Sequence, residues 1–274
     1  MVEKILFLTS GGIKGVAFIG VIQALKYKNM LHEFITVVGT SIGSIIASLF
    51  ASKFEAEEMI QCFIKLDLSK LVNMNIFDMF NEYGLNDGKY IEKIIDNLMY
   101  YKHKKKKITL KELYEKTRIK LIITTTNLST KKSEFLSYET YPNLPVSKAV
   151  RMSCSIPIYF TPVKYNGHYY IDGACTANYP THLFELTNDN FMGIYISNIN
   201  EKNTKINNFI DIILNTLQCV SEDHFFKDNE ILKSNTLILN PTINPVEFTI
   251  DKKQAINLYK DGISKTLKFI NSKI

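Results

Sequence analysis

The chain has 274 residues, of which 46% are hydrophobic and 22% are charged. A chain of this length and composition can bury a sizeable core, so we exclude a largely disordered protein. We expect one large domain over residues 1–274, with or without an inserted cap. The four cysteines have neither Cys-x-x-Cys spacing nor nearby histidine pairs, and they give no indication of a zinc site.

The apolar segments of the chain are all short. The run at residues 5–8 is followed by glycines and a lysine, where a signal peptide would continue its hydrophobic region. The segments around 16–25 and 42–51 fall short of the roughly 20 residues that a membrane-spanning helix needs. We therefore expect a cytoplasmic protein without signal peptide or transmembrane segment, which touches a membrane at most from one side.

The first fifty residues alternate between predicted strands and predicted helices. Continuous apolar runs predict strands at 4–9 and 34–38, and apolar residues at helical spacing predict helices at 15–26 and 42–54. This order is typical of a parallel sheet, in which ligands bind at the carboxyl ends of the strands.

Residues 55–108 form a predicted helical region that is interrupted at 84–88 and is rich in Met, Phe and Ile. Two interpretations stay open for this region. It could be a helical cap over a lipid site, or its apolar residues could be ordinary core packing, which is the commoner role of Met and Phe at helical spacing. After it, Thr109 and Glu112 have the spacing of a capping box at the start of a helix.

The rest of the chain completes the predicted sheet and its helices. We predict strands at 120–126, 133–138, 191–197 and 236–239, helices at 146–153, 206–232 and 252–270, and a hairpin over 163–172 about Asn166 and Gly167. Residues 190–272 thus form the closing strands and helices of the domain.

Ser41 lies between Gly39 and Gly43, directly after a predicted strand and before a predicted helix. A serine hydroxyl can attack a carbonyl if it stands on a tight strand-to-helix turn, and glycines two positions away on each side relieve the crowding of that turn. The pattern is the sequence form of a nucleophile elbow, although small-residue turns are also common in α/β proteins of other functions.

The glycine-rich loop after the first predicted strand could stabilise an oxyanion. Backbone N–H groups of Gly11, Gly12 and Gly15 could approach the oxygen closely, and Lys14 adds positive charge at a helix start. Such a loop could also hold phosphate. However, the Walker spacing is absent, and Ser10 stands where a dinucleotide-binding fingerprint begins with glycine.

Attack by Ser41 needs a base, and the sequence offers two kinds. Asp172, followed by Gly173 and Ala174, ends a predicted strand at a rim where it could face Ser41, although Asp before Gly is also common in turns. Alternatively, the chain order Ser, Asp, His permits His182 or His224 to act as the base, although none of the five histidines lies in an obvious catalytic context.

Taken in order, three motifs resemble the patatin-like phospholipase family: the loop 10–15, the elbow 39–43 and the Asp-Gly-Ala motif 172–174. The likeness extends over a core at 4–180 and includes the segment 153–163. It implies a three-layer α/β/α fold with a central, mostly parallel sheet. The family usually has glycine at the position of Ser10. A serine restricts the left-handed backbone conformations that glycine would allow.

The resemblance also implies a mechanism, in which Ser41 and Asp172 form a dyad without histidine. Asp172 takes the proton of Ser41, the loop amides hold the oxyanion, and water hydrolyses the acyl-serine. Because an ordinary aspartate has a pKa of about 3.9, Asp172 must be partly desolvated or tightly positioned to act as a base. The scheme needs no metal and no cofactor, so calcium-independent hydrolysis is expected.

The sequence therefore predicts a lipid acyl hydrolase that cleaves phospholipids or lysophospholipids, with the phospholipid membrane as its partner. The net charge is +6, and we expect anionic membranes to attract its lysine run, although such a run is more often a solvated loop. The run comprises Lys102, Lys104, Lys105, Lys106 and Lys107. No aromatic residues are interleaved with these lysines, so no nucleic-acid binding is expected. A catalytically silent module that binds lipid or nucleotide is the remaining alternative.

Overall fold

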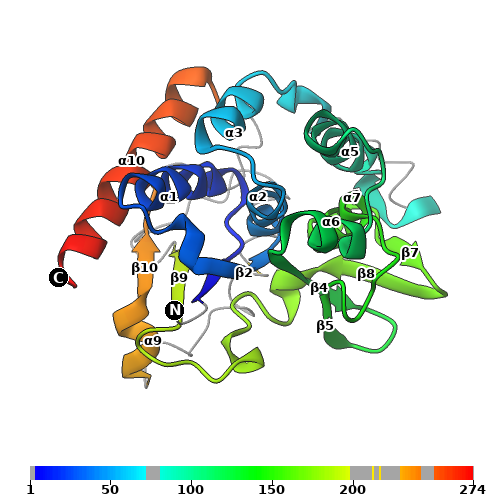
Figure 1. Cartoon of the computed structure of the whole chain (residues 1–274). Coiled ribbons are helices and arrows are strands. Elements are labelled where there is room, and N and C mark those ends of the chain that lie inside the picture. Colours follow the sequence, from blue (N-terminus) through cyan, green and yellow to red (C-terminus); the bar gives the residue numbers. More distant parts are fainter. Residues whose placement is uncertain are drawn as a thin grey trace.

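A mixed β-sheet forms the centre of the molecule (Figure 1). The computed structural model describes residues 4–71, 81–197, 212, 216, 229–241 and 250–273. The strand order is β10-β9-β1-β2-β4-β8-β7, with β5 paired to β4. The strands of this sheet are β1 (Lys4–Leu8), β2 (Phe34–Thr40), β4 (Lys120–Asn127), β5 (Lys132–Leu136), β7 (Val163–Tyr165), β8 (His168–Asp172), β9 (Phe191–Ile196) and β10 (Thr236–Leu239).

The middle of the sheet is parallel. Strands β10, β9, β1, β2 and β4 all run in one direction, whereas β5 and β8 are antiparallel to β4, and β7 is antiparallel to β8. Side chains alternate between the two faces of β1, with Leu6 and Leu8 in one apolar cluster and Ile5 and Phe7 in the other. The predicted central, mostly parallel sheet flanked by helices is therefore confirmed.

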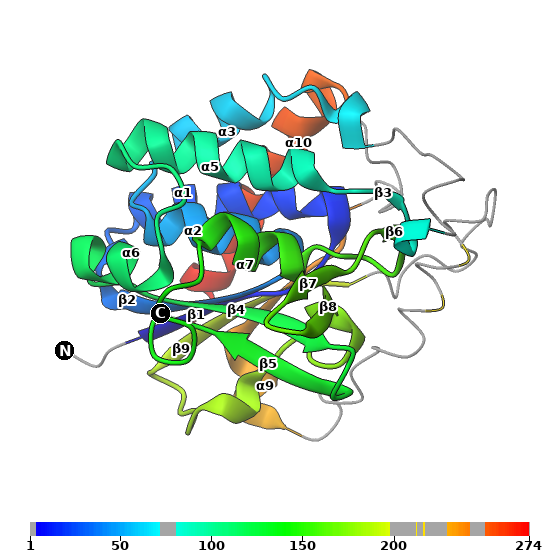
Figure 2. The ribbon, with the colours of Figure 1, turned by 90° about the vertical axis from the view of Figure 1, so that its right-hand side faces the viewer.

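Helices cover one face of the sheet in two tiers (Figure 2). The α-helices are α1 (Val16–Tyr27), α2 (Ile42–Ala51), α3 (Ala56–Phe63), α5 (Lys89–His103), α6 (Leu110–Thr117), α7 (Val146–Ser153), α9 (Glu230–Asn235) and α10 (Lys252–Asn271). Helices α1, α2 and α7 lie nearest the sheet, and α3 and α5 lie outside them. On the other face, Leu232 of α9 packs with Tyr179 against Phe7 and Val38. None of the helices described here is long and apolar enough to cross a bilayer.

Two predicted elements differ from the structure. The interruption at 84–88 contains a strand, β3 (Gly84–Asn86), which pairs with β6 (Ile158–Phe160) in a separate two-stranded sheet. A three-residue strand is too short to show a periodicity. The predicted helix 206–232 falls largely outside the described residues, but a single helix reaching Leu232 is wrong. Asn229 is extended, and its side chain accepts the Leu232 N–H to start α9.

The structure confirms two short sequence patterns, a hairpin turn and a helix capping box. Asn166 and Gly167 have φ angles of 47° and 81°, as a two-residue hairpin between β7 and β8 requires. Thr109 accepts a hydrogen bond from the Glu112 N–H, and the Glu112 carboxylate accepts one from Thr109, which confirms the capping box of α6.

Candidate active site

Ser41 lies on the tight turn that joins β2 to α2. Its φ and ψ are 55° and −124°, an unusual conformation for a residue with a side chain. A Cβ on Gly39 would lie 2.5 Å from the Gly43 carbonyl oxygen, and one on Gly43 would lie 2.1 Å from the Leu8 carbonyl oxygen. The chain can make this turn beside β1 only because both positions are glycine, which is the physical reason for the motif.

Two serine hydroxyls hold the backbone of this turn. The Ser41 N–H donates to Ser153 Oγ at 2.9 Å, and Ser153 Oγ in turn donates to the Thr124 carbonyl at 2.6 Å. The Ser44 hydroxyl donates to the Ser41 carbonyl at 2.6 Å. Ser153 and Ser44 are fully buried, so these bonds do not compete with bulk water. The backbone of Ser41 is thus restrained on both sides of its side chain.

The Ser41 hydroxyl donates a hydrogen bond to Asp172 Oδ2 over 2.6 Å. Asp172 ends β8 opposite Thr125 of β4, and its other carboxylate oxygen, Oδ1, accepts the Ala174 N–H at 2.9 Å. Its own N–H donates to the Ser155 carbonyl. Ser41 and Asp172 are 131 residues apart in the chain, and the sheet brings them together as the motif order predicts.

Burial raises the pKa of Asp172 to about 6. The hydrogen bonds from Ser41 and Ala174 oppose this shift, because they favour the charged carboxylate. Asp172 is only 3% exposed and Ser41 only 7% exposed. The desolvation that an aspartate base requires is therefore present at this position.

The glycine-rich loop lies next to Ser41. Gly12 has a φ of 54° and begins a 3-10 segment, Gly12–Gly15, in which the Lys14 N–H donates to the Gly11 carbonyl. Ser10 has no positive φ, and its N–H donates to Asn178 Oδ1 at 2.8 Å. The left-handed conformation therefore falls on Gly12, and a serine at position 10 fits the loop without strain.

The predicted loop residues have different surroundings. Gly12 lines the cavity in which Ser41 stands, whereas the Lys14 side chain is fully buried. Gly11 approaches Ile196 of β9, and Gly15 approaches Ile42, closely enough that a Cβ at either position would clash. The backbone of the loop thus packs directly against side chains of β9 and α2.

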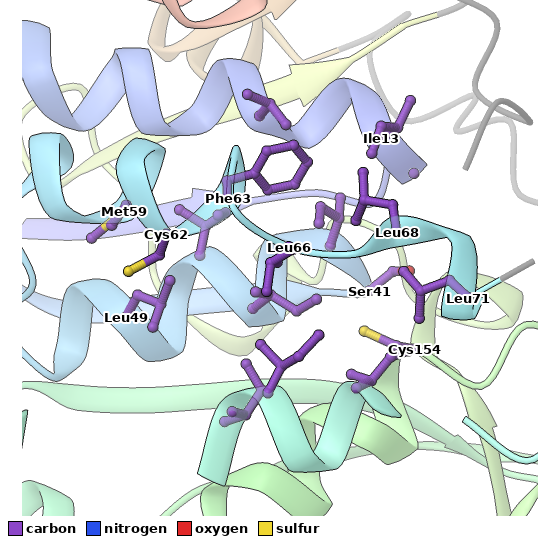
Figure 3. Close-up of a pocket in the computed structure, with 18 of the residues that line it drawn as sticks. Ile13, Ser41, Leu49, Met59, Cys62, Phe63, Leu66, Leu68, Leu71 and Cys154 are labelled. Atoms are coloured by element: carbon purple, nitrogen blue, oxygen red, sulfur yellow. The ribbon is translucent and has the colours of Figure 1, made fainter. Parts of the chain in front are cut away.

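An apolar cavity of about 120 Å³ extends from Ser41 between α2 and the outer tier of helices (Figure 3). Ser41, Leu68 and Leu71 lie at one end in this view, and Leu49 and Met59 lie toward the other. Nearly all lining residues are aliphatic, aromatic or sulfur-containing. From the region 55–108 they are Met59, Cys62, Phe63, Leu66, Leu68, Leu71, Ile91, Ile94, Ile95 and Leu98.

Residues of the region 55–108 contribute to the core and to the wall of the cavity. Ile60 and Met99 are buried in the main core without lining the cavity, whereas Phe63, Leu66 and Leu98 are only partly buried and face it. One apolar stretch therefore serves both packing and the wall of the cavity.

Sequence reasoning missed the parts played by Ser44, Ser153 and Cys154. Cys154 lines the cavity, and its Sγ is 3.8 Å from Ser44 Oγ. Burial raises the pKa of Cys154 to about 12, so the thiol stays protonated at neutral pH. In the sequence, the segment 153–155 stands out only through the family likeness. Its contact with the elbow joins residues 112 positions apart, so residue spacing does not predict it.

The candidate histidines do not join this site. His182 is exposed, and its ring centroid lies 5.8 Å from that of Phe135, which packs on the opposite face of the sheet. His224 lies outside the described residues. No histidine in the described part of the chain lines the cavity. Nor do any three His, Cys, Asp or Glu side chains in that part group as a metal site would require.

The lysine run continues from the last turn of α5 toward α6. Lys102 pairs with Glu58 at 2.8 Å, and Lys105 pairs with Glu112 at 2.6 Å. In Figure 2 this end of α5 lies away from β3 and β6, across the molecule from the loop end of the sheet. A helix of 15 residues is about 22 Å long, so the run lies about that far from the end of α5 next to β3.

The chain is similar in sequence to known proteins over most of its length. The sequence profile of the patatin-like phospholipase family matches residues 6–185. The chain is 30% identical to an uncharacterized protein of Acanthamoeba polyphaga mimivirus, over 98% of this chain and 95% of that protein. It is also 30% identical to the probable lipid hydrolase 463L of Invertebrate iridescent virus 6, over 96% of this chain and 87% of that protein.

Solved structures share the fold at low sequence identity. VipD from Legionella pneumophila matches with a TM-score of 0.66 and 16% identity, over 99% of this chain and 67% of VipD. The type III effector protein ExoU matches with a TM-score of 0.60 and 16% identity, over 100% of this chain and 53% of ExoU. These likenesses establish a common architecture.

Proposed function

Because this chain belongs to the patatin-like phospholipase family, a family of lipid hydrolases, we propose that it cleaves acyl esters of phospholipids or lysophospholipids through a Ser41/Asp172 dyad. One observation carries the proposal. The Ser41 hydroxyl donates to a buried carboxylate at 2.6 Å and stands at one end of an apolar cavity.

In the proposed reaction, Asp172 Oδ2 takes the hydroxyl proton as Ser41 Oγ bonds to the ester carbonyl carbon. The carbonyl oxygen becomes an oxyanion, for which the loop that begins at Gly12 would offer N–H donors. The ester C–O bond then breaks, and the leaving alcohol takes the proton from Asp172. Water deprotonated by Asp172 next attacks the acyl-serine, the fatty acid leaves, and the proton returns to Ser41 Oγ.

The cavity supports an acyl lipid as the substrate. A carbonyl placed at Ser41 would leave its hydrocarbon chain to run between α2, α3 and α5, where the walls are apolar. Burial of hydrocarbon in such a cavity is favourable, at about 0.8 kcal/mol for each CH₂ group. The region 55–108 would then act as the proposed cap, because it supplies one side of the cavity.

We further propose that hydrolysis is calcium-independent, because the chain supplies its own base and its own oxyanion donors. Chelation of divalent cations would then leave the rate of hydrolysis of a soluble ester unchanged. Loss of activity in chelator, restored by added calcium, would refute this part of the proposal.

The proposed function is tested by product analysis on mixed membrane lipids, with the wild type beside the S41A variant. We expect free fatty acid and lysophospholipid, or the fully deacylated product, with wild type alone. A fluorophosphonate probe should label the wild type and leave S41A unlabelled. Lipid binding without either result would instead support the catalytically silent module.

The second candidate is an esterase with a histidine base, His182 or His224. Replacement of both histidines by alanine separates the two schemes, since the dyad predicts near-normal turnover and the histidine scheme predicts a large loss. The exposure of His182 and its position beside Phe135 favour the dyad.

A further inference from the structure

We propose that an exposed apolar rim docks the enzyme on an anionic phospholipid surface. The rim consists of Tyr83, Leu128, Ile158 and Tyr169, which lie where β3, β6 and β8 begin and where β4 ends. The proposal rests on the proposed function, because it names the surface across which a membrane lipid would reach Ser41.

The rim is continuous although its residues come from four segments. The rings of Tyr83 and Tyr169 meet edge to face, with centroids 6.4 Å apart. The Leu128 N–H donates to the Tyr169 carbonyl at 2.8 Å. Ile158 pairs in register with Gly84, the residue that follows Tyr83. Tyr169 therefore links the tip of β4 to the small β3–β6 sheet.

The rim exposes large side chains, two of them on strained backbone. Tyr83 is 64% exposed, Leu128 48% and Ile158 38%, whereas Tyr169 is partly buried. Tyr83 and Ile158 have φ angles of 64° and 69°, in the left-handed region, where β-branched residues are rare outliers. Such strain is characteristic of functional positions.

The rim adjoins two residues that line the cavity. Ile158 stands in the chain between Ile156 and Phe160, and both of these residues line the cavity that contains Ser41. A bilayer seated on the rim would thus present its lipids beside the apolar walls. Tyrosine suits this position because its ring is apolar and its hydroxyl remains in the polar interface.

The charge near the rim fits an anionic surface. Lys164 pairs with Tyr169 in the hairpin, and its Nζ lies over the Tyr169 ring, 5.6 Å from the centroid. Lys131 lies in the turn that contains Leu128, and Lys132 begins β5 directly after it. Among the described residues, none of these three lysines pairs with a carboxylate. Anionic lipids attract lysines placed in this way.

Three nearby acids partly offset this charge. Asp87 is paired with Lys89 at 2.9 Å, and Glu82 is exposed beside Tyr83. The Glu134 carboxylate accepts hydrogen bonds from Asn127 and Tyr170, the neighbours of Leu128 and Tyr169 in the chain. The three lysines therefore still outnumber the two acids that lack a lysine partner, Glu82 and Glu134. In contrast, the lysine run 102–107 lies at the far end of α5, and two of its lysines are already in ion pairs.

The test is co-sedimentation of the full chain with vesicles of phosphatidylcholine and phosphatidylserine, mixed at roughly three to one, and with vesicles of phosphatidylcholine alone. The S41A background prevents hydrolysis during the measurement. The rim variant carries Y83S and I158N. The matched control is Y27S, because Tyr27 is also 64% exposed and ends α1.

We expect the rim variant to lose about tenfold or more in vesicle affinity and Y27S to lose none. K164E should weaken binding to the mixed vesicles more than to phosphatidylcholine alone. In the Ser41-containing protein, the same rim changes should leave hydrolysis of a soluble short-chain ester unchanged, which also shows that the variants fold.

The proposal is overturned if S41A protein binds neither vesicle, or if the rim variant binds as S41A alone does. Loss of binding in K104E/K106E instead would place docking at the lysine run. A wild type that binds vesicles through the rim but hydrolyses no ester would refute the proposed function and leave the docking surface intact.

Discussion

Ser41 Oγ donates to only one oxygen of Asp172, Oδ2, at 2.6 Å, while the Ala174 N–H occupies the other. This division fixes the orientation of the carboxylate and leaves Oδ2 directed at the hydroxyl. Because Asp172 is buried, its charge has few other partners to stabilise it. The same contact therefore bears on both the activity and the stability of the protein.

The pKa of Asp172 predicts the pH dependence of activity. Only the ionised carboxylate can accept the Ser41 proton, and burial raises the pKa of Asp172 to about 6. We expect kcat/KM on a soluble ester to rise with pH through an apparent pKa near 6 and then to level off. An activity that stays constant down to pH of about 4 would contradict this assignment.

The same shift predicts that replacement of Asp172 by Asn stabilises the fold at neutral pH. The folded-state pKa of about 6 lies above the ordinary value of 3.8, so the wild type loses stability as pH rises through about 6. The loss is roughly 3 kcal/mol in the free energy of unfolding. This loss of unfolding free energy should be present at pH 8 and absent near pH 4, and the D172N variant should not show it.

Denaturant unfolding of wild type and D172N at both pH values measures this difference, because other titrating groups cancel between the two proteins. An equal free-energy gap between them at both pH values would mean that Asp172 is not desolvated as the structure indicates.

Ser153 is predicted to position the nucleophile. The S153A change leaves the Ser41 N–H and the Thr124 carbonyl without their buried partner, at a cost of about 1–3 kcal/mol. We expect kcat to fall about tenfold or more with KM little changed, and S153T to restore part of the loss.

Ser147 provides the control for this experiment. It lies on the same helix, α7, is 1% exposed, and its hydroxyl has no hydrogen-bond partner among the described residues. S147A should therefore leave kcat near that of wild type. Equal effects of S147A and S153A on kcat would show that the Ser153 bond has no special role in the elbow.

Gly43 is predicted to be intolerant of any side chain. A Cβ would lie 2.1 Å from the Leu8 carbonyl oxygen, and this backbone atom cannot yield without moving β1. We expect G43A to lose about 3 kcal/mol or more, or not to fold. At Gly167, where φ is 81° and no atom lies within 4 Å of an added Cβ, G167A should cost only about 1–2 kcal/mol. Denaturant midpoints compare the two variants, and similar losses would refute the steric argument.

Local patterns predicted most of the elements that carry the site. The strand before Ser41, the helix after it and the hairpin before Asp172 all have strong periodicity or turn residues, and the structure contains each of them. Motif order then indicated that Ser41 and Asp172 meet, because both lie near the same edge of the sheet.

Contacts between distant segments were not predictable in this way. Ser153 reaches Ser41 only because α7 packs beside β4 and α2, and the two serines are 112 residues apart in the chain. Strand β6 is three residues long, and its pairing with β3 depends on the packing of both segments. The rim around Tyr169 likewise combines side chains whose proximity has no signal in sequence spacing.

The most direct test of the central claim is the rate of fatty-acid release from phosphatidylcholine by D172N, compared with wild type, in the presence of chelator. Since Asn cannot accept the Ser41 proton, the dyad predicts a fall of about a thousandfold or more, in a protein that remains folded. A D172N variant with near-normal turnover would contradict the dyad and require a different base for Ser41.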